Sequence, residues 1–171
     1  NYAALGKMLD AAGLLRKLLA RTAPENRADV ALNLMIMNFN AANYQEVLVL
    51  GEVFPVYLKD IAYSKHKNLL LLSDCLIGMS YMQQREYDKS EEYLLRVQDA
   101  KERNDLSAKE RKFLNESYYY LGWVYYKQSK YMEAATNFAA AGKLIKASAM
   151  QQEALLMECW CYYSSMDYRQ A

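Results

Sequence analysis

Two short segments carry side chains that could do chemistry. The single histidine, His66, lies in the polar segment SKHKN, and Cys159 and Cys161 flank Trp160 in the segment CWC. A histidine acting as a general base needs a nucleophile and an orienting partner, and the residues around His66 supply neither. On a helix, thiols two residues apart point roughly 200° from each other and cannot easily grip one metal ion. We therefore interpret His66 as a solvated residue between two helices and the cysteines as structural.

Other signatures of catalysis or cofactor binding are missing from the sequence. It has no glycine-rich phosphate loop, no Walker lysine and no zinc-protease helix. The formal net charge is +1, with both signs scattered, so charge gives no reason to expect a nucleic acid or an anionic membrane as partner. The longest apolar runs, such as Leu69–Leu72, are far shorter than the roughly 20 residues that span a bilayer. We predict a protein without enzymatic activity, cofactor, metal or membrane insertion.

Composition indicates a helical globular chain. Its 171 residues are 53% apolar and 24% charged, which suits one domain, residues 1–171, with a sizeable core. Two prolines and six glycines leave few breaks and favour helices. Three cysteines without a disulfide framework favour a reducing compartment such as the cytoplasm, although buried free thiols also survive elsewhere. The chain starts at Asn1 without a secretory signal pattern, so we expect it to be part of a longer protein whose cellular compartment is unknown.

A tyrosine-centred motif recurs along the chain. A polar residue, tyrosine, two mostly polar residues and a small or aliphatic residue follow one another around Tyr2, Tyr44, Tyr87, Tyr131 and Tyr168, at spacings of 42, 43, 44 and 37 residues. Between the tyrosines, apolar residues recur every three or four positions, as in helices. We predict eight helices, near 2–20, 23–41, 44–63, 68–84, 87–103, 107–129, 131–147 and 149–165, and a ninth that begins at Tyr168. The repeat units are 1–22, 23–64, 68–104, 107–148 and 149–171.

Some helix ends have local signals. TAPE at Thr22 and SAKE at Ser107 both fit the capping box, in which a hydroxyl and a glutamate satisfy free backbone amides. Pro24 falls in a first turn, where its missing N–H costs nothing. Pro55 falls inside a predicted helix and should kink it or end it.

The repeat resembles the tetratricopeptide repeat. That family's pattern of large, Leu, small and Tyr, followed by a turn and further aromatic and alanine positions, is matched by Tyr118, Leu121, Gly122, Tyr125, Tyr131, Ala134, Phe138 and Ala141. The repeat built on Gly78 matches it fairly, with Asp74 in the large position. The repeat with Cys159 in the small position has Glu158 in place of leucine. The repeat at 23–64 departs most, with Met35 in the small position and Asn38 in place of tyrosine. The resemblance implies an all-α fold: a right-handed solenoid, or superhelix, of antiparallel helix pairs.

Gly122 and Ala134 have a physical role in such a pair. Small residues let two antiparallel helices approach closely, while the surrounding rings fill the gaps. A helix pair cannot bury its apolar face alone, so pairs are expected to stack and share one core. We therefore expect most aromatic residues of the segment 118–138 to stabilise the packing of the helix pair.

The resemblance also implies a concave surface lined by the first helix of each pair. The matching positions are Leu32, Ile36 and Phe39; Cys75, Met79 and Met82; Tyr119, Trp123 and Tyr126; and Leu156, Trp160 and Tyr163. None of these is a lysine or arginine, unlike the positions of family members that clamp a peptide carboxylate. An apolar, aromatic groove suits a partner helix or an apolar peptide, and could also admit a small apolar ligand. We predict a binding site at Ile36, Phe39, Met79, Met82, Tyr119, Trp123, Tyr126, Leu156, Trp160 and Tyr163.

Two alternatives stay open. The stripe could be core, or be covered by another part of the chain, rather than a partner site. The leading function is a protein–protein interaction scaffold. The alternative is a ligand- or peptide-sensing segment of a larger signalling or transcription protein, since one fold hosts many functions.

Overall fold

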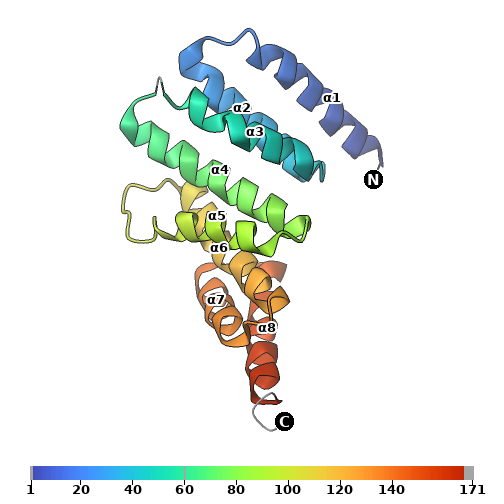
Figure 1. The fold of residues 1–171 in the computed structure, drawn as a ribbon, viewed down its shortest axis with the longest axis vertical. Coiled ribbons are helices and arrows are strands. Elements are labelled where there is room, and N and C mark those ends of the chain that lie inside the picture. The colour runs from blue at the N-terminus through green and yellow to red at the C-terminus, as the bar shows by residue number, and fades with distance from the viewer. Residues whose placement is uncertain (1, 60, 168–171) are drawn as a thin grey trace.

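The computed structural model describes residues 2–59 and 61–167, and this part of the chain contains helices and no strand (Figure 1). The helices are α1 (Tyr2–Leu19), α2 (Pro24–Asn40), α3 (Tyr44–Tyr57), α4 (Tyr63–Gln83), α5 (Tyr87–Gln98), α6 (Ala108–Lys127), α7 (Tyr131–Leu144) and α8 (Ala149–Asp167). The all-helical prediction is confirmed. The predicted start of a ninth helix at Tyr168 lies outside the described residues.

Several predicted helix bounds are wrong at one end. Helix α3 ends at Tyr57 instead of 63, because Pro55 offers no N–H to the preceding turn and Leu58 bonds to the Pro55 carbonyl at 3.3 Å in a tighter turn. Helices α5 and α7 end five and three residues before the predicted positions, at Gln98 and Leu144.

His66 is not between helices, contrary to the prediction. Helix α4 begins at Tyr63 rather than at 68, so the SKHKN segment forms its first turns. The His66 backbone N–H donates to the Ala62 carbonyl oxygen at 3.0 Å. Two lysines that flank a histidine are compatible with a helical turn at the surface. The polarity of this segment alone was therefore not evidence for a linker.

The two predicted capping boxes have opposite outcomes. At Ser107 the box is confirmed: the Glu110 N–H donates to Ser107 Oγ at 3.3 Å, and the Ser107 N–H donates to Glu110 Oε2 at 2.6 Å. At Thr22 it is wrong, since α2 starts one residue later and the Thr22 hydroxyl donates to the Leu18 carbonyl at 2.8 Å. The hydroxyl completes the end of α1 instead of starting α2. Pro24 occupies the first turn of α2, as predicted.

Three helix-to-helix turns share one geometry. The turns α2–α3, α4–α5 and α6–α7 each contain a non-glycine residue with left-handed φ: Ala42 at 58°, Arg85 at 64° and Ser129 at 61°. In each, the next residue donates its N–H to the carbonyl five positions back, at 2.8–3.0 Å. This bond pattern ends the first helix and reverses the chain. The tyrosine that follows, Tyr44, Tyr87 or Tyr131, is the first residue of the next helix.

The helices form a stack in which each packs on near neighbours in sequence (Figure 1). Besides the consecutive pairs, α2 contacts α4, α4 contacts α6 and α6 contacts α8. The even-numbered helices therefore lie next to one another along one side of the stack.

Small residues set the closest helix approaches. A Cβ on Gly122 would lie 2.7 Å from the Phe138 ring on α7, and a Cβ on Gly78 would lie 2.8 Å from Leu94 on α5. Phe138 and Leu94 both stand seven residues after their turn tyrosine. In the α2–α3 pair this position is Gly51, opposite the buried Met35, whose Cε lies 4.0 Å from a Cβ built on Gly51. The atoms nearest to that Cβ belong instead to Ile77 on α4, at 2.7 Å, so Gly51 makes room chiefly for α4.

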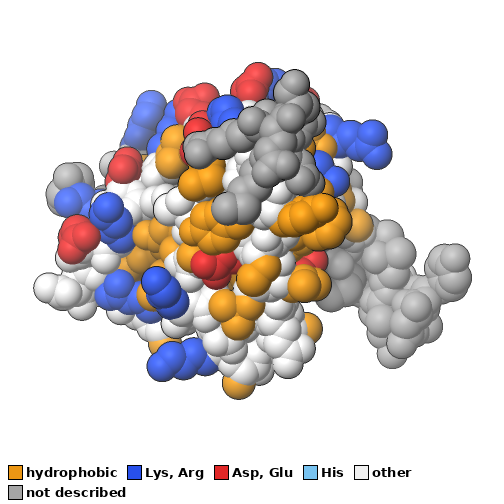
Figure 2. Space-filling view, turned by 90° about the horizontal axis from the view of Figure 1, so that it is seen from below, with side chains coloured by type: hydrophobic (Ala, Val, Ile, Leu, Met, Phe, Trp, Pro, Cys, Tyr) orange, Lys and Arg blue, Asp and Glu red, His pale blue; other side chains and the backbone are white. Residues whose placement is uncertain are grey.

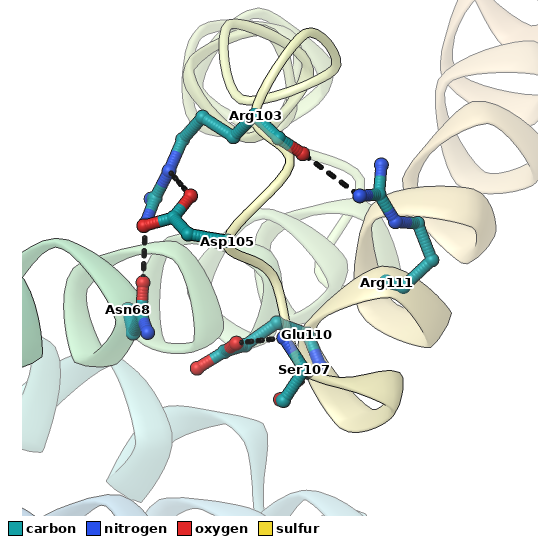
Figure 3. A network of polar contacts seen from close by, with 6 residues as sticks. All are labelled: Asn68, Arg103, Asp105, Ser107, Glu110 and Arg111. Atoms are coloured by element: carbon teal, nitrogen blue, oxygen red, sulfur yellow. Dashed lines mark hydrogen bonds and ion pairs between the residues drawn. The ribbon is translucent and has the colours of Figure 1, made fainter.

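The loop between α5 and α6 is fixed by polar contacts (Figure 3). Arg103 Nη2 donates to Asn68 Oδ1 on α4, and Arg103 also pairs with Asp105 at 2.8 Å. Arg111 Nη2 donates to the Arg103 carbonyl at 2.8 Å. Together with the Ser107–Glu110 box, these bonds fix where α6 starts relative to α4 and α5.

Candidate functional site

The residues first considered for chemistry lie apart from one another. His66 is partly buried in α4, while Cys159 is exposed and Cys161 is buried on α8. Burial raises the pKa of the Cys161 thiol to about 11 and that of Cys75 further, so neither is a ready nucleophile. Within the described residues, no three His, Cys, Asp or Glu side chains are grouped to hold a metal ion.

Helices α6 and α8 present a group of large apolar side chains, here called the aromatic face: Tyr119, Trp123, Tyr126, Leu156, Trp160 and Tyr163. Trp160 Nε1 donates to the Tyr126 hydroxyl oxygen at 3.1 Å, which joins α8 to α6. The Trp123 and Tyr126 rings meet edge to face with centroids 5.7 Å apart. The two tryptophans are thus connected through Tyr126.

Exposure is greatest on α8. Leu156, Trp160 and Tyr163 are 69%, 52% and 60% exposed, whereas Tyr119, Trp123 and Tyr126 are partly buried. Figure 2, which views the molecule from the end where α8 lies, shows hydrophobic side chains gathered on this face. Because α8 is the last described helix of the stack, no described helix packs on its far side, and large apolar side chains left open there are typical of a surface that a neighbouring helix or another molecule covers.

The remaining predicted residues are more enclosed. Met79 is 3% exposed, and Leu32 and Cys75 are 4% and 0% exposed, so these three are core side chains. Ile36, Phe39 and Met82 are partly buried against the core. The predicted stripe is therefore uneven: it is core at Met79 and accessible on α8.

A cavity of about 550 Å³ adjoins the aromatic face at Trp123. This cavity, the Trp123 pocket, is lined by Met82, Gln83, Arg85, Tyr87, Trp123 and Lys127, from α4, the α4–α5 turn, α5 and α6. Its volume is in the range of ligand-binding clefts. Met82 and Trp123 contribute apolar side chains to its lining, and Arg85 and Lys127 contribute two cations.

Cations also lie close to the aromatic rings. The groove positions identified from the sequence contain no lysine or arginine, so these cations were not predicted. Lys127 Nζ lies 5.7 Å from the Trp123 ring centroid and 5.9 Å from that of Tyr126. Both distances suit a cation–π contact. The signal available in the sequence was the position of Lys127, directly after Tyr126 and four residues after Trp123 on one helix. Arg85 had no such signal because it reaches the pocket from a turn.

The hydroxyls of Tyr119 and Tyr125 on α6 stay protonated over the physiological range. Burial, together with the nearby Glu153 carboxylate, raises the pKa of Tyr119 to about 12, against the opposing effect of Trp123. Burial likewise raises the pKa of Tyr125 to about 12. Such hydroxyls can donate or accept hydrogen bonds but carry no charge for catalysis.

Two findings bear on the class of protein. Across the described helices, none combines the length and the apolar character needed to cross a membrane. No protein-family model, no curated protein and no solved structure matches this chain significantly.

Proposed function

We propose that the chain is a non-enzymatic interaction scaffold built as a right-handed superhelix of tetratricopeptide type. Its concave side is the side of the even-numbered helices, and the aromatic face binds a peptide or helix of another protein. The observation that carries the proposal is the exposure of Leu156, Trp160 and Tyr163 beside the Trp123 pocket. The shared turn geometry and the contacts α2–α4, α4–α6 and α6–α8 support the repeat architecture.

The chemistry of the surface indicates the kind of partner. Large rings are the commonest anchors of protein interfaces, and a pocket between Met82 and Trp123 suits a bulky apolar side chain. Arg85 and Lys127 line the same pocket, and no carboxylate does. A partner segment with an aromatic or aliphatic anchor next to an aspartate or glutamate fits both features, because its carboxylate would meet these two cations.

Selection from a displayed peptide library on the purified chain tests this function. Selected sequences should carry a large apolar residue close to an acidic one. Combining Trp123→Ala with Trp160→Ala should weaken the best peptide roughly 30-fold or more, as loss of a binding hot spot does. The double variant should weaken binding more than it lowers folding stability.

Tyr162→Ala is the matched control, since Tyr162 is also exposed on α8, at 42%, but lies two residues from Trp160 and so on another side of the helix. It should leave the affinity within about twofold, because binding hot spots are confined to a few residues. Lys127→Glu should weaken the binding of acidic peptides. It should leave unchanged the binding of the same peptides with amides in place of carboxylates. Absence of any enriched sequence, or equal effects of the tryptophan and Tyr162 variants, would overturn the proposal.

A further inference from the structure

A second cavity, of about 530 Å³, lies at the other end of α6. It is a partly open cavity lined by the first half of α6, the end of α7, the connection to α8 and the first turn of α8. Its apolar lining consists of Ala108, Leu144, Ile145 and Met150. Lys112 and Lys127 mark the two ends of α6, about 22 Å apart at 1.5 Å per residue. A small molecule bound here would not reach the Trp123 pocket.

Three cations border this cavity: Arg111, Lys112 and Lys146. One carboxylate, Glu116, lies among them, with Lys112 Nζ 3.6 Å from Glu116 Oε1. Burial raises the pKa of Glu116, against the opposing effect of Lys112, which shows that its charged form is poorly solvated. Cations outnumber carboxylates around an otherwise apolar wall, so the cavity is complementary to an anion that has an apolar part.

The walls of the cavity are held in place by bonds on both sides. Arg111 Nη2 donates to the Arg103 carbonyl (Figure 3), and a guanidinium has further donors to offer a ligand. Four residues later on α6, Asn115 Nδ2 donates to the Leu144 carbonyl at the end of α7, at 3.3 Å. Gln151 braces the connection twice, donating to the Gly142 carbonyl and accepting from the Ala147 N–H, both at 2.9 Å. A cavity fixed in this way needs little ordering when a ligand binds.

We propose that this cavity binds a small amphipathic carboxylate, of the class of a medium-chain fatty acid. The carboxylate lies among Arg111, Lys112 and Lys146, and the hydrocarbon chain lies on Leu144, Ile145 and Met150. Charge-assisted hydrogen bonds orient the head, and burial of the chain supplies apolar contact. A ligand site of this kind is separate from the peptide surface and adds a small-molecule input to a scaffold.

The test is a titration of the purified chain followed by backbone amide NMR at physiological salt. Three probes separate the contributions: octanoate, octylammonium with the same tail and opposite charge, and acetate with the same head and no tail. Octanoate should shift amides of residues 111–116 and 144–151. Octylammonium and acetate should each bind at least roughly tenfold more weakly than octanoate. This is the loss expected when a charge-assisted bond or the apolar contact is missing.

Variants locate the site. Lys146→Glu should weaken octanoate binding roughly tenfold, whereas Lys143→Glu, the same change on a neighbouring exposed lysine outside the lining, should change it less than about threefold because salt screens distant charges. Ala108→Trp, at an exposed helix start, should fill the cavity and abolish binding while the melting temperature stays the same.

Several results would overturn the proposal. These are equal binding of octanoate and octylammonium, an equal loss with Lys143→Glu and Lys146→Glu, or shifts centred on the indole N–H groups of Trp123 and Trp160. Failure here leaves the peptide surface untouched, since Trp160→Ala should not alter octanoate binding. Different measurements therefore test the peptide surface and the octanoate cavity.

Discussion

At the scale of single residues, the three shared turns place Ala42, Arg85 and Ser129 in a backbone region that favours glycine. A side chain in this left-handed region costs roughly 1 kcal/mol because its Cβ approaches the following carbonyl oxygen. The strain recurs at each turn, so it is compensated by the bonds that close the turn. These positions are therefore places where stability can be gained.

Ser129→Gly should raise the free energy of unfolding by about 0.5–1 kcal/mol, because glycine adopts φ near 61° without the Cβ clash. Urea denaturation measures the change. Thr136→Gly, inside α7 and exposed, is the control and should lower stability by about 0.3 kcal/mol through helix propensity. Loss of stability at both sites would show that the Ser129 side chain stabilises its turn.

Asp74 gives the fold a pH dependence. It is 6% exposed on α4, and burial raises its pKa from 3.8 to about 6, against the opposing effect of Arg96. Because the folded pKa exceeds the unfolded one, the stabilisation by the neutral form is complete below about pH 4. It is lost as pH rises to about 6.

Asp74→Asn should remove this loss and make the protein more stable at pH 7.5 by roughly 1–3 kcal/mol, with little change at pH 4. Denaturation midpoints of both proteins across this range provide the measurement. The difference between them isolates Asp74 from other carboxylates such as Glu91, whose pKa is lowered. Parallel pH profiles for the two proteins would contradict the assignment.

At the scale of elements, the pairing of α6 with α7 depends on Gly122. A leucine there should destabilise the protein by about 1–3 kcal/mol, because its Cβ would lie 2.7 Å from the Phe138 ring, which is itself fully buried. Gly13→Leu on α1 is the control: no atom lies within 4 Å of its added Cβ, so stability should be unchanged or slightly higher. Equal melting temperatures for the two variants would rule out a close α6–α7 contact at Gly122.

Local sequence signals predicted helix type and most starts well, and ends less well. The tyrosine after each turn marked the starts of α3, α5 and α7 because the same turn geometry precedes all three. The end of α5 at Gln98 has no glycine or proline near it, so only tertiary contacts set it. The start of α4 was missed for a similar reason, since nothing in its polar first turns distinguishes a helix from a linker.

The contacts between helices were harder to predict than the positions of the helices in the sequence. Gly51 has the side chain of Ile77 on α4 as its nearest neighbour, and Met35 on α2 lies farther away, which the repeat pattern alone did not indicate. The candidate site shows the same limit. Its positions on α6 and α8 were those that the family resemblance implied, but the burial of Met79 and the position of Arg85 in a turn depend on the neighbouring helices.

At the scale of the whole molecule, stability should vary along the stack. Helix α4 contacts α2, α3, α5 and α6, whereas α1 contacts only α2 among the described helices. Assemblies of this kind open in parts, starting where few contacts hold them. Amide hydrogen exchange should therefore be fastest in α1 and slowest in α4 and α6. Equal protection in all helices would indicate one all-or-none unit instead.

The common turn also has a consequence for how such a chain can change over evolution. Because α2–α3, α4–α5 and α6–α7 close with the same backbone geometry, one pair can be duplicated or deleted as a block. The helices on either side would then meet the same kind of neighbour as before. Length would change in whole steps, and the reach of the molecule could be adjusted by gene duplication without redesigning any interface inside it.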